Sequence, residues 1–342
     1  MRILYLGSLS PNACSSFYAN AAEALGHEVF RWDPGMFASE HVWESFLIRW
    51  NHHPLKKKID ACSEFVLRKC QELNIELVLN LAENFLSSDL LQELRSLPCP
   101  PKLIYHSHDN NFSDGILKPS DFFDTLSLYD CVFTTKSQNL QRYKMLGQPL
   151  SFYIPSAFEP QVHRPLSANE SKLGGKSFQV TFVGTYDRSR DKFLNAVGWE
   201  QLYVWGDRWT KYRNYRKYRD HIVPHAIYHP DFADVISHSE IALGLLREEA
   251  EDRHTQRTFE IPACGTLQIA PRNEEILSYF DEDKEIVCFD SLDELKDKVT
   301  YYKAHLGERK KIAAKGFDRV QRGNHTYQDR IKMMLSKIHL AD

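Results

Sequence analysis

The chain has 342 residues, of which 42% are hydrophobic and 26% charged, and a formal net charge of -3. This balance is typical of a folded globular protein and excludes a disordered or fibrous chain. The length fits two domains of about 150 to 170 residues better than one core. The slightly negative charge provides no overall cationic field for nucleic acid.

The N-terminal sequence MRILYLGSLSP has a short apolar run, which predicts a first strand rather than a signal peptide. No run reaches the ~18 apolar residues that a membrane-spanning helix needs. The seven cysteines are spread out without a C-x-x-C pair, which predicts free thiols. We expect a cytoplasmic protein, with a peripheral position at the inner membrane face as an alternative.

In the first half, short apolar runs alternate with amphipathic or polar stretches, as in βαβ units. Helices are predicted over 15–25 and over 40–73, the second with a break near Pro54. Strands are predicted at 3–6, 28–32, 77–81, 102–106, 131–134 and 152–155. The pattern indicates an open parallel sheet wrapped by helices.

Residues 156–176 are rich in Pro and Gly and predict a domain boundary. The alternation then restarts, and a helical stretch begins at 292 with Ser291 as N-cap and Gly307 as a break. Strands are predicted at 179–183, 201–205, 241–245, 267–270 and 285–289.

This pattern predicts Rossmann-like domains over 1–160 and 161–325, and a helix over 326–342 that packs back on the first domain. Ligands bind outside the carboxyl ends of parallel strands, so the expected site is an inter-domain cleft.

The segment DRHTQRTFEIPACGTLQIAP, residues 252–271, carries the strongest functional signal. It places Glu260 at the start of a short helix, where the helix dipole favours a carboxylate. Such a carboxylate can also accept hydrogen bonds from a vicinal diol such as ribose. First-turn N–H groups, including that of Thr258, suit a diphosphate. From the residues alone, a favourable charge at a helix start is the simpler interpretation.

The sequence E-I-P-A-C-G-T followed by an apolar strand resembles the donor-site segment of family 4 glycosyltransferases. That family has two spaced acidic residues, of which the second binds the donor ribose. Glu260 fits the second position, and Asp252 stands where the first Glu is expected. The change from Glu to Asp leaves the catalytic role of Asp252 open.

The wider pattern resembles the bacterial CgeB-like spore-protein glycosyltransferases over about residues 178–335, and only in topology before that. The matching features are R-T-F-E-I-P-A-C-G, Gly184 with Arg188, Gly206 with Trp209, Phe280, Lys284 to Val287, Tyr301-Tyr302, His325 to Tyr327 and Arg330. The resemblance implies an α/β protein of the GT-B fold, whose two parallel sheets face a deep cleft. It implies an acceptor-binding first domain, a nucleotide-sugar-binding second domain, no metal and no other cofactor.

Cations follow the predicted strand that ends at Gly184. A bidentate Arg, or a Lys, can stabilise charge on a leaving diphosphate. The resemblance implies this role for an Arg and a Lys in this region, where Arg188 is the preferred residue and Arg190 and Lys192 are further candidates. Arg257 is a second phosphate candidate on the same grounds. The alternative is a solvated surface loop.

His106, His108 and Asp109 end the strand KLIYHSHDN. Packing or backbone hydrogen bonding is a better explanation for these histidines than a metal site. The resemblance implies that His108 contacts the transferred sugar, and Asp109 is the candidate base if the reaction inverts.

Gly7 and Ser8 follow the first predicted strand, and their backbone N–H groups could bind a phosphate or sugar. The G-x-G-x-x-G fingerprint is missing there, which disfavours a dehydrogenase.

Residues 205–222, WGDRWTKYRNYRKYRDHI, interleave basic and aromatic residues. Such a segment could bind an anionic acceptor, a membrane surface or nucleic acid. The favoured interpretation is a solvated helix face over packed aromatic rings. The acidic turn 281–283 is interpreted as a solvated loop rather than a metal-binding D-x-D.

Together these features predict a metal-independent glycosyltransferase that uses a nucleoside-diphosphate sugar. The acceptor could be a saccharide, a lipid-linked glycan, a protein or a nucleic acid. Family 4 similarity implies retention of the anomeric configuration, and the Asp252 departure keeps inversion open. The alternatives are a two-domain nucleotide-sugar epimerase and a non-catalytic sugar-binding or spore or capsule assembly protein.

Overall fold

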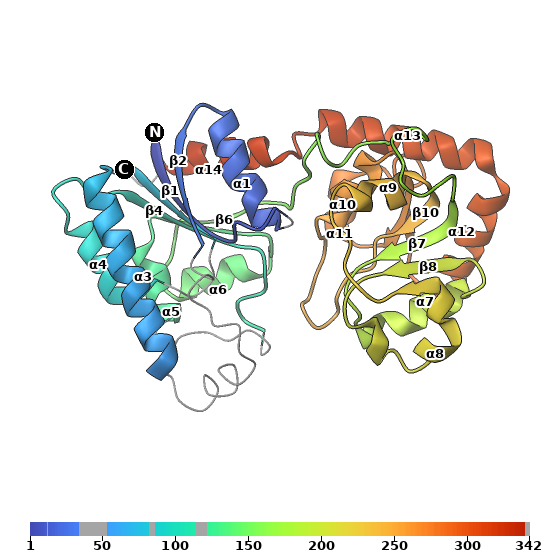
Figure 1. Ribbon diagram of the computed structural model, residues 1–342, viewed down its shortest axis with the longest axis horizontal. Coiled ribbons are helices and arrows are strands. Elements are labelled where there is room, and N and C mark those ends of the chain that lie inside the picture. Colours follow the sequence, from blue (N-terminus) through green and yellow to red (C-terminus); the bar gives the residue numbers. More distant parts are fainter. Residues whose placement is uncertain (12, 34–52, 82–85, 114–121, 339–342) are drawn as a thin grey trace. The chain divides into compact units, whose positions relative to one another are not determined.

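The computed structural model describes residues 1–11, 13–33, 53–81, 86–113 and 122–338 (Figure 1). The chain forms two compact units, Met1–Pro155 with Tyr327–Asp342, and Ser156–Thr326. We refer to them as unit 1 and unit 2. Within the described residues, no helix is long and apolar enough to cross a membrane.

Unit 1 is built on a six-stranded parallel sheet with the order β2-β1-β3-β4-β5-β6. Its register places Leu4 of β1 between Phe30 of β2 and Val78 of β3. The strands are β1 (Arg2–Leu6), β2 (Glu28–Trp32), β3 (Leu77–Asn80), β4 (Lys102–Ser107), β5 (Cys131–Thr134) and β6 (Ser151–Tyr153). The helices are α1 (Cys14–Ala24), α3 (His53–Glu72), α4 (Ser88–Arg95), α5 (Phe122–Thr125), α6 (Asn139–Met145) and α14 (Tyr327–Ile338), with a 3₁₀ turn at Leu126–Leu128.

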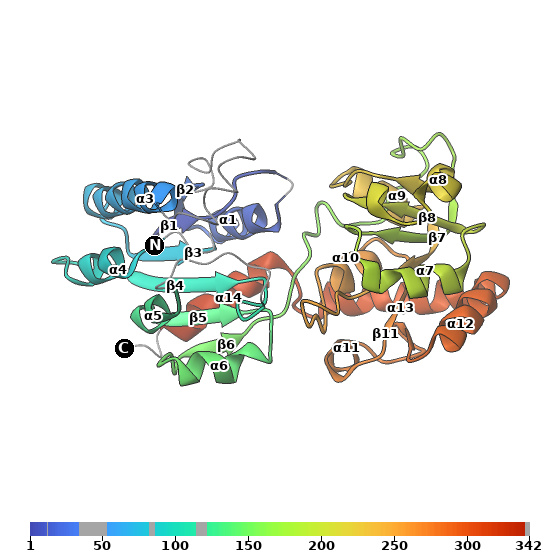
Figure 2. The same ribbon diagram turned by 90° about the horizontal axis from the view of Figure 1, so that it is seen from below.

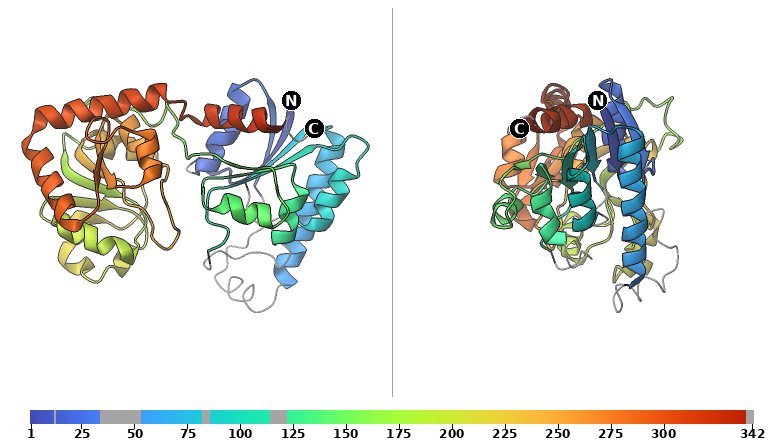
Figure 3. Two further views of the ribbon diagram at one scale, coloured as in Figure 1. Left: turned by 180° about the vertical axis from the view of Figure 1, so that it is seen from behind. Right: turned by 90° about the vertical axis from the view of Figure 1, so that its left-hand side faces the viewer.

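All residues of β3 and β5 are buried, as expected for a parallel sheet with helices on both faces. Helix α14 is last in the sequence, yet it packs against α1 near the N-terminus (Figure 3). Tyr327 stacks edge-on to Tyr18, with 4.9 Å between the ring centroids. The predicted helix over 40–73 is described only from His53, and its earlier part lies outside the described residues.

Unit 2 contains a second six-stranded parallel sheet with the order β12-β11-β10-β7-β8-β9. The strands are β7 (Phe178–Val183), β8 (Leu202–Trp205), β9 (Ile222–Val223), β10 (Ser239–Leu243), β11 (Leu267–Pro271) and β12 (Val287–Phe289). The helices are α7 (Asp191–Val197), α8 (Tyr215–Tyr218), α9 (Asp231–Ser237), α10 (Arg257–Ala263), α11 (Glu274–Tyr279), α12 (Leu292–Ala304) and α13 (Leu306–Arg322). Short 3₁₀ turns occupy Arg188–Arg190, Trp209–Lys211 and Arg219–His221. The α/β prediction is confirmed in both units, although the two-residue strand β9 was not predicted.

Two local predictions about unit 2 are wrong. Residues 205–222 form two 3₁₀ turns, the single turn of α8 and strand β9 rather than one helix. Arg208 adopts a left-handed φ of 65°, which interrupts a right-handed helix early in this segment. The predicted helix break at Gly307 instead falls at His305, whose ring stacks on Tyr301 at 3.9 Å. The N-cap prediction is confirmed, since Ser291 Oγ accepts the Glu294 N–H at 3.1 Å.

Two glycines of α13 provide a matched test of its packing. A Cβ atom on Gly316 would lie 2.4 Å from the Glu285 carbonyl oxygen, whereas one on Gly307 would meet nothing within 4 Å. We expect Gly316→Ala to lower the free energy of unfolding by about 1–3 kcal/mol, because the helix must move off the chain before β12. Gly307→Ala should raise it by up to about 1 kcal/mol. Urea denaturation followed by circular dichroism measures both, and equal effects would contradict this packing.

Candidate functional site

The order of strands in unit 2 reverses between β7 and β10. From β7 the chain continues through β8 and β9 on one side, and β10 to β12 lie on the other side. In such a sheet the connections leave in opposite directions, which opens a crevice at the carboxyl ends of the two strands. Gly184 follows β7 at this edge, and Gly244 follows β10.

The loops at this edge pack backbone against backbone. Gly206, after β8, has a φ of 151°, and a Cβ atom there would lie 2.0 Å from the Gly184 carbonyl oxygen. The buried Trp209 donates its indole N–H to the same oxygen at 2.8 Å. The Tyr186 N–H donates to the Asp207 carbonyl at 2.8 Å. The turns after β7 and β8 are therefore fixed to each other.

Arg190 joins the turn after β7 to the turn after β10. Its guanidinium donates to the carbonyl of Thr185 at 2.8 Å and to those of Leu245 and Leu246 at 3.4 Å. It also lies over the Phe182 ring, 5.1 Å from the centroid. Burial lowers the pKa of Arg190 to about 10, which still leaves it charged at neutral pH. The structure thus makes Arg190 a clamp across the crevice rather than a free phosphate ligand.

Glu260 and Arg257 lie beside the end of β7. Arg257 pairs with one Glu260 oxygen, donates to the Val183 carbonyl at 3.3 Å and stacks 3.9 Å from the Phe232 ring centroid. The Glu260 side chain is only 7% exposed, whereas that of Arg257 is 32% exposed. The buried carboxylate and the accessible guanidinium are therefore presented together at this edge of the sheet.

His163 completes this group and was missed in the sequence. Its Nε2 lies 3.4 Å from the other Glu260 oxygen, and its Nδ1 accepts the Glu159 N–H at 3.0 Å. In the neutral ring the proton must then sit on Nε2, facing Glu260. Burial lowers the pKa of His163, which Glu260 offsets in part. The only sequence signal was a lone histidine in the Pro- and Gly-rich boundary segment, which is too weak to single it out.

At three positions in the first turn of α10, the backbone N–H group is already hydrogen-bonded, contrary to the prediction of free groups. The N–H groups of Thr258 and Phe259 donate to the Thr255 and Gln256 carbonyls at 3.0 and 2.9 Å, and that of Glu260 donates to Gln256 at 2.9 Å. The chain already turns in the αR conformation at Gln256, so these donors are used before a ligand arrives. The expectation of a diphosphate contact by the Thr258 N–H is corrected accordingly.

The remaining predicted residues of unit 2 have different surroundings. The Asp252 side chain is fully buried, and its carboxylate lies 2.9 Å from Arg247 Nε. Lys192 pairs with Glu248 at 2.7 Å on the surface. Arg188 is exposed on the 3₁₀ turn after Gly184, and its guanidinium donates no hydrogen bond within the part of the chain that the structure describes.

In unit 1, Gly7 and Ser8 follow β1 at the carboxyl edge of the sheet. The Gly7 N–H donates to the Trp32 carbonyl at 3.0 Å, which corrects the expectation that it is free for a ligand. The Ser8 carbonyl accepts the Ser15 hydroxyl at 3.2 Å.

His108 and Asp109 follow β4 at the same edge of unit 1. The Thr135 hydroxyl donates to the His108 carbonyl at 2.8 Å, and the Ser107 hydroxyl donates to the Asp109 carbonyl at 3.0 Å. Both ring nitrogens of His108 are shielded from solvent and make no hydrogen bond within the described residues. Burial lowers the pKa of His108 to about 4, so its ring is neutral at pH 7.

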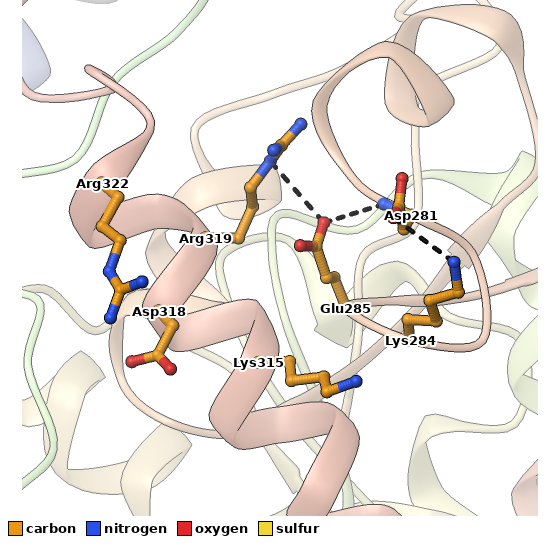
Figure 4. A pocket seen from close by; sticks show the side chains of 7 residues that line it. All are labelled: Asp281, Lys284, Glu285, Lys315, Asp318, Arg319 and Arg322. Carbon is orange, nitrogen blue, oxygen red and sulfur yellow. Dashed lines mark hydrogen bonds and ion pairs between the residues drawn. The ribbon is translucent and has the colours of Figure 1, made fainter.

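A separate shallow pocket of unit 2 has a volume of about 360 Å³ (Figure 4). Four of its charged residues form two pairs, Arg319 with Glu285 and Lys284 with Asp281, each at 3.6 Å. Glu285 precedes β12, so this pocket lies at the amino edge of the parallel sheet, opposite Gly184. The acidic turn 281–283 lies here, and no three His, Cys, Asp or Glu among the described residues are grouped to hold a metal ion.

The chain is similar to a known protein family and to solved structures of known fold. Residues 188–336 match the family model described as glycosyl transferase-like. No curated protein matches the sequence.

Similar solved structures cover nearly the whole chain. Sucrose-phosphate synthase from Thermosynechococcus elongatus has 15% identity and a TM-score of 0.72, over 99% of both chains. A glycosyltransferase from Rickettsia africae ESF-5 has 12% identity and a TM-score of 0.68, over 99% of this chain and 98% of that one. Anabaena HepE, solved with UDP, has 14% identity and a TM-score of 0.65, over 98% of this chain and 100% of that one. HepE was also solved with UDP-glucose.

The two six-stranded parallel sheets with flanking helices are those of the GT-B fold, as in sucrose-phosphate synthase. Residues 188–336, which run from unit 2 into α14, are in addition similar to the glycosyl transferase-like family, and the chain as a whole has the GT-B fold.

Proposed function

We propose that the protein transfers a sugar from a nucleoside-diphosphate sugar, of the UDP-sugar type, to an acceptor bound by unit 1. The observation that carries this proposal is the Glu260 carboxylate held by Arg257 and His163 beside the end of β7. A carboxylate has about four lone-pair sites, and two partners leave room for the two hydroxyls of a ribose. The complexes of HepE with UDP and UDP-glucose support the choice of donor.

The cations at this edge would stabilise the leaving diphosphate. Arg188 is exposed, and Arg257 is part-exposed at the Val183 carbonyl, so both can donate hydrogen bonds to phosphate oxygens. Hydrogen bonds to charged groups that strengthen as the leaving group departs lower the barrier. Lys192 would join them by exchanging its exposed partner Glu248 for phosphate. This division of roles needs no metal.

In unit 1, we assign the neutral His108 to a hydroxyl of the transferred sugar and Asp109 to the acceptor side. A ring with unused nitrogens shielded from solvent is suited to a hydrogen bond with a sugar hydroxyl. We assign Ser8, in the loop after β1, to the same sugar. Retention follows if the family 4 resemblance extends to the chemistry.

We assign Asp252 to loop structure rather than to the reaction. Its carboxylate is fully buried against Arg247, which leaves no surface for a substrate. The pair instead closes the loop between β10 and α10, because the Asp252 N–H also donates to the Arg247 carbonyl at 3.1 Å.

The ribose assignment predicts the effect of Glu260→Gln. The amide keeps the shape of the side chain but replaces an acceptor oxygen with a donor, so we expect donor affinity to fall about 10- to 100-fold, as for the loss of a charged hydrogen bond. Titration calorimetry with UDP measures it. Asp234→Asn is the matched control, since Asp234 is a buried carboxylate 3.1 Å from His238 at the amino edge of the sheet. Equal loss in both variants would contradict the assignment.

The clamp predicts a specific effect of Arg190→Lys. A lysine keeps the charge but lacks the planar fork that reaches three carbonyls. We expect the KM for the donor to rise about 10-fold as the turns after β7 and β10 separate. Arg309→Lys is the control, because Arg309 is also buried and donates to the Tyr302 carbonyl at 2.9 Å, next to Glu240 at the opposite edge. The Arg309→Lys variant should have a lower melting temperature and an unchanged KM for the donor. An equal rise in KM in both variants would refute the role of Arg190 as a clamp.

The proposal also predicts that catalysis survives a chelator. Transfer from the donor, followed by release of the nucleoside diphosphate, should keep its rate in excess EDTA, because Arg and Lys side chains supply the positive charge. Abolished transfer that returns with added Mg²⁺ or Mn²⁺ would refute metal independence. Chromatography of the sugar products in the same assay separates transfer from epimerisation of the donor.

A further inference from the structure

The segment between β8 and β9 carries a dense patch of positive charge. We call residues 208–219 the basic segment. It contains no acidic residue, and six of its twelve residues are basic and exposed: Arg208, Lys211, Arg213, Arg216, Lys217 and Arg219. The chain as a whole has a net charge of -3, so this concentration is local.

The aromatic residues of the basic segment point inward. Trp209 and Tyr212 are 0% and 4% exposed, and both belong to the core of unit 2. Tyr218 stacks on Trp199 with 4.8 Å between the centroids, and the Tyr212 hydroxyl donates to Asn195 at 2.9 Å. These contacts fix the backbone from beneath, and the basic side chains are left on the solvent side.

The nearby acids do not neutralise the patch. Asp207 accepts the Ala226 N–H at 2.8 Å, and Asp220 lies 3.8 Å from Arg219 in a pair whose side chains are 89% and 72% exposed. Exposed pairs of this kind contribute little and are screened by salt. The like charges of the segment repel one another, and a polyanion would relieve this repulsion.

We propose that the basic segment docks the protein on an anionic lipid surface. Each cation near such a surface contributes a roughly five-fold gain in affinity, so several small contributions add up to stable association. The chemistry shared with other phosphate ligands is the recognition of phosphate oxygens by Arg and Lys. This proposal does not depend on the identity of the sugar donor.

The geometry of the segment favours a bilayer over nucleic acid. Proteins that bind single strands stack bases on exposed aromatic rings. Here Trp209 and Tyr212 are buried, and Tyr215 and Tyr218 are half-buried against the same core. Reading a duplex groove requires an inserted helix or ribbon, and the only α-helix of the segment, α8, is a single turn of four residues. A surface of exposed cations over packed rings suits a broad layer of headgroup charge.

The test is flotation of the full-length protein with vesicles. In about 0.1 M salt, the protein should float with phosphatidylcholine vesicles that contain phosphatidylglycerol, and it should stay unbound with phosphatidylcholine alone. In about 1 M salt, binding should be lost. The triple variant R213E/R216E/K217E should bind the anionic vesicles at least about 100-fold more weakly.

The matched control is K310E/K311E/K315E, which makes the same change in net charge on α13. Helices α8 and α13 lie on opposite sides of unit 2 in Figures 1 and 2. The control should bind vesicles like the wild type, and both variants should keep the wild-type melting temperature and affinity for UDP. Because these last two readouts are separate from flotation, a misfolded variant is recognised, and the single variant R213E then replaces it.

Three results would overturn the proposal. Equal binding to neutral vesicles would show that charge does not cause the binding. Equal loss of binding in both triple variants would show that the position of the charges in the basic segment does not matter. Release from vesicles by inorganic phosphate at constant ionic strength would indicate a discrete phosphate site instead. Tighter binding of an RNA or DNA oligonucleotide than of vesicles, abolished by R213E/R216E/K217E, would assign the segment to nucleic acid.

Discussion

The close approach of the turns after β7, β8 and β10 is the constraint on which the candidate site depends. Parallel strands end at one edge, and the reversal of order between β7 and β10 leaves a crevice there. Gly206 lets the backbone reach Gly184, and Arg190 ties the two sides together through three carbonyls. A guanidinium is suited to this position because its planar fork satisfies several carbonyls at once while staying charged.

The position of the turn after β7 also determines where the charged side chains lie at this edge of the sheet. Arg257 reaches the last carbonyl of β7, at Val183, and from there it pairs with Glu260. A buried carboxylate without partners lowers stability. Here the Arg257 guanidinium and the neutral His163 ring both stabilise the Glu260 carboxylate. The Asp252–Arg247 pair shows the contrast, because its carboxylate is sealed within a loop. The same ion-pair chemistry thus forms part of the candidate site in one place and closes a loop in the other.

The fold was largely predictable because buried parallel strands are short continuous apolar runs. All strands of both sheets except β9 were located within two residues or so, and the Ser291 cap followed from its local hydrogen bond. Residues 205–222 were mistaken for a helix because their basic residues recur at helical spacing, whereas tertiary packing of Trp209 and Tyr212 sets the backbone. Glycine often ends a helix, and for this reason a break was predicted at Gly307. Gly307 does not adopt a positive φ, so it stays inside α13.

The candidate site was less predictable than the fold. Glu260 and Arg257 are close in sequence, so their pairing follows from one turn of helix. His163 lies far from them along the chain. Arg190 and Arg188 share one turn, but Arg190 is buried against backbone carbonyls and Arg188 is exposed. Such contacts are set by tertiary structure, and a single sequence contains no periodic signal for them. The use of first-turn N–H groups by Thr255 and Gln256 likewise depends on backbone conformation rather than on residue type.

The most direct test of the central claim is a crystal structure with a bound nucleoside-diphosphate sugar. The account predicts that both ribose hydroxyls lie within hydrogen-bond distance of the Glu260 carboxylate, with the diphosphate between the Gly184 turn and Arg257. A nucleotide bound elsewhere on unit 2, for instance in the pocket beside Arg319, with Glu260 still holding only Arg257 and His163, would contradict it.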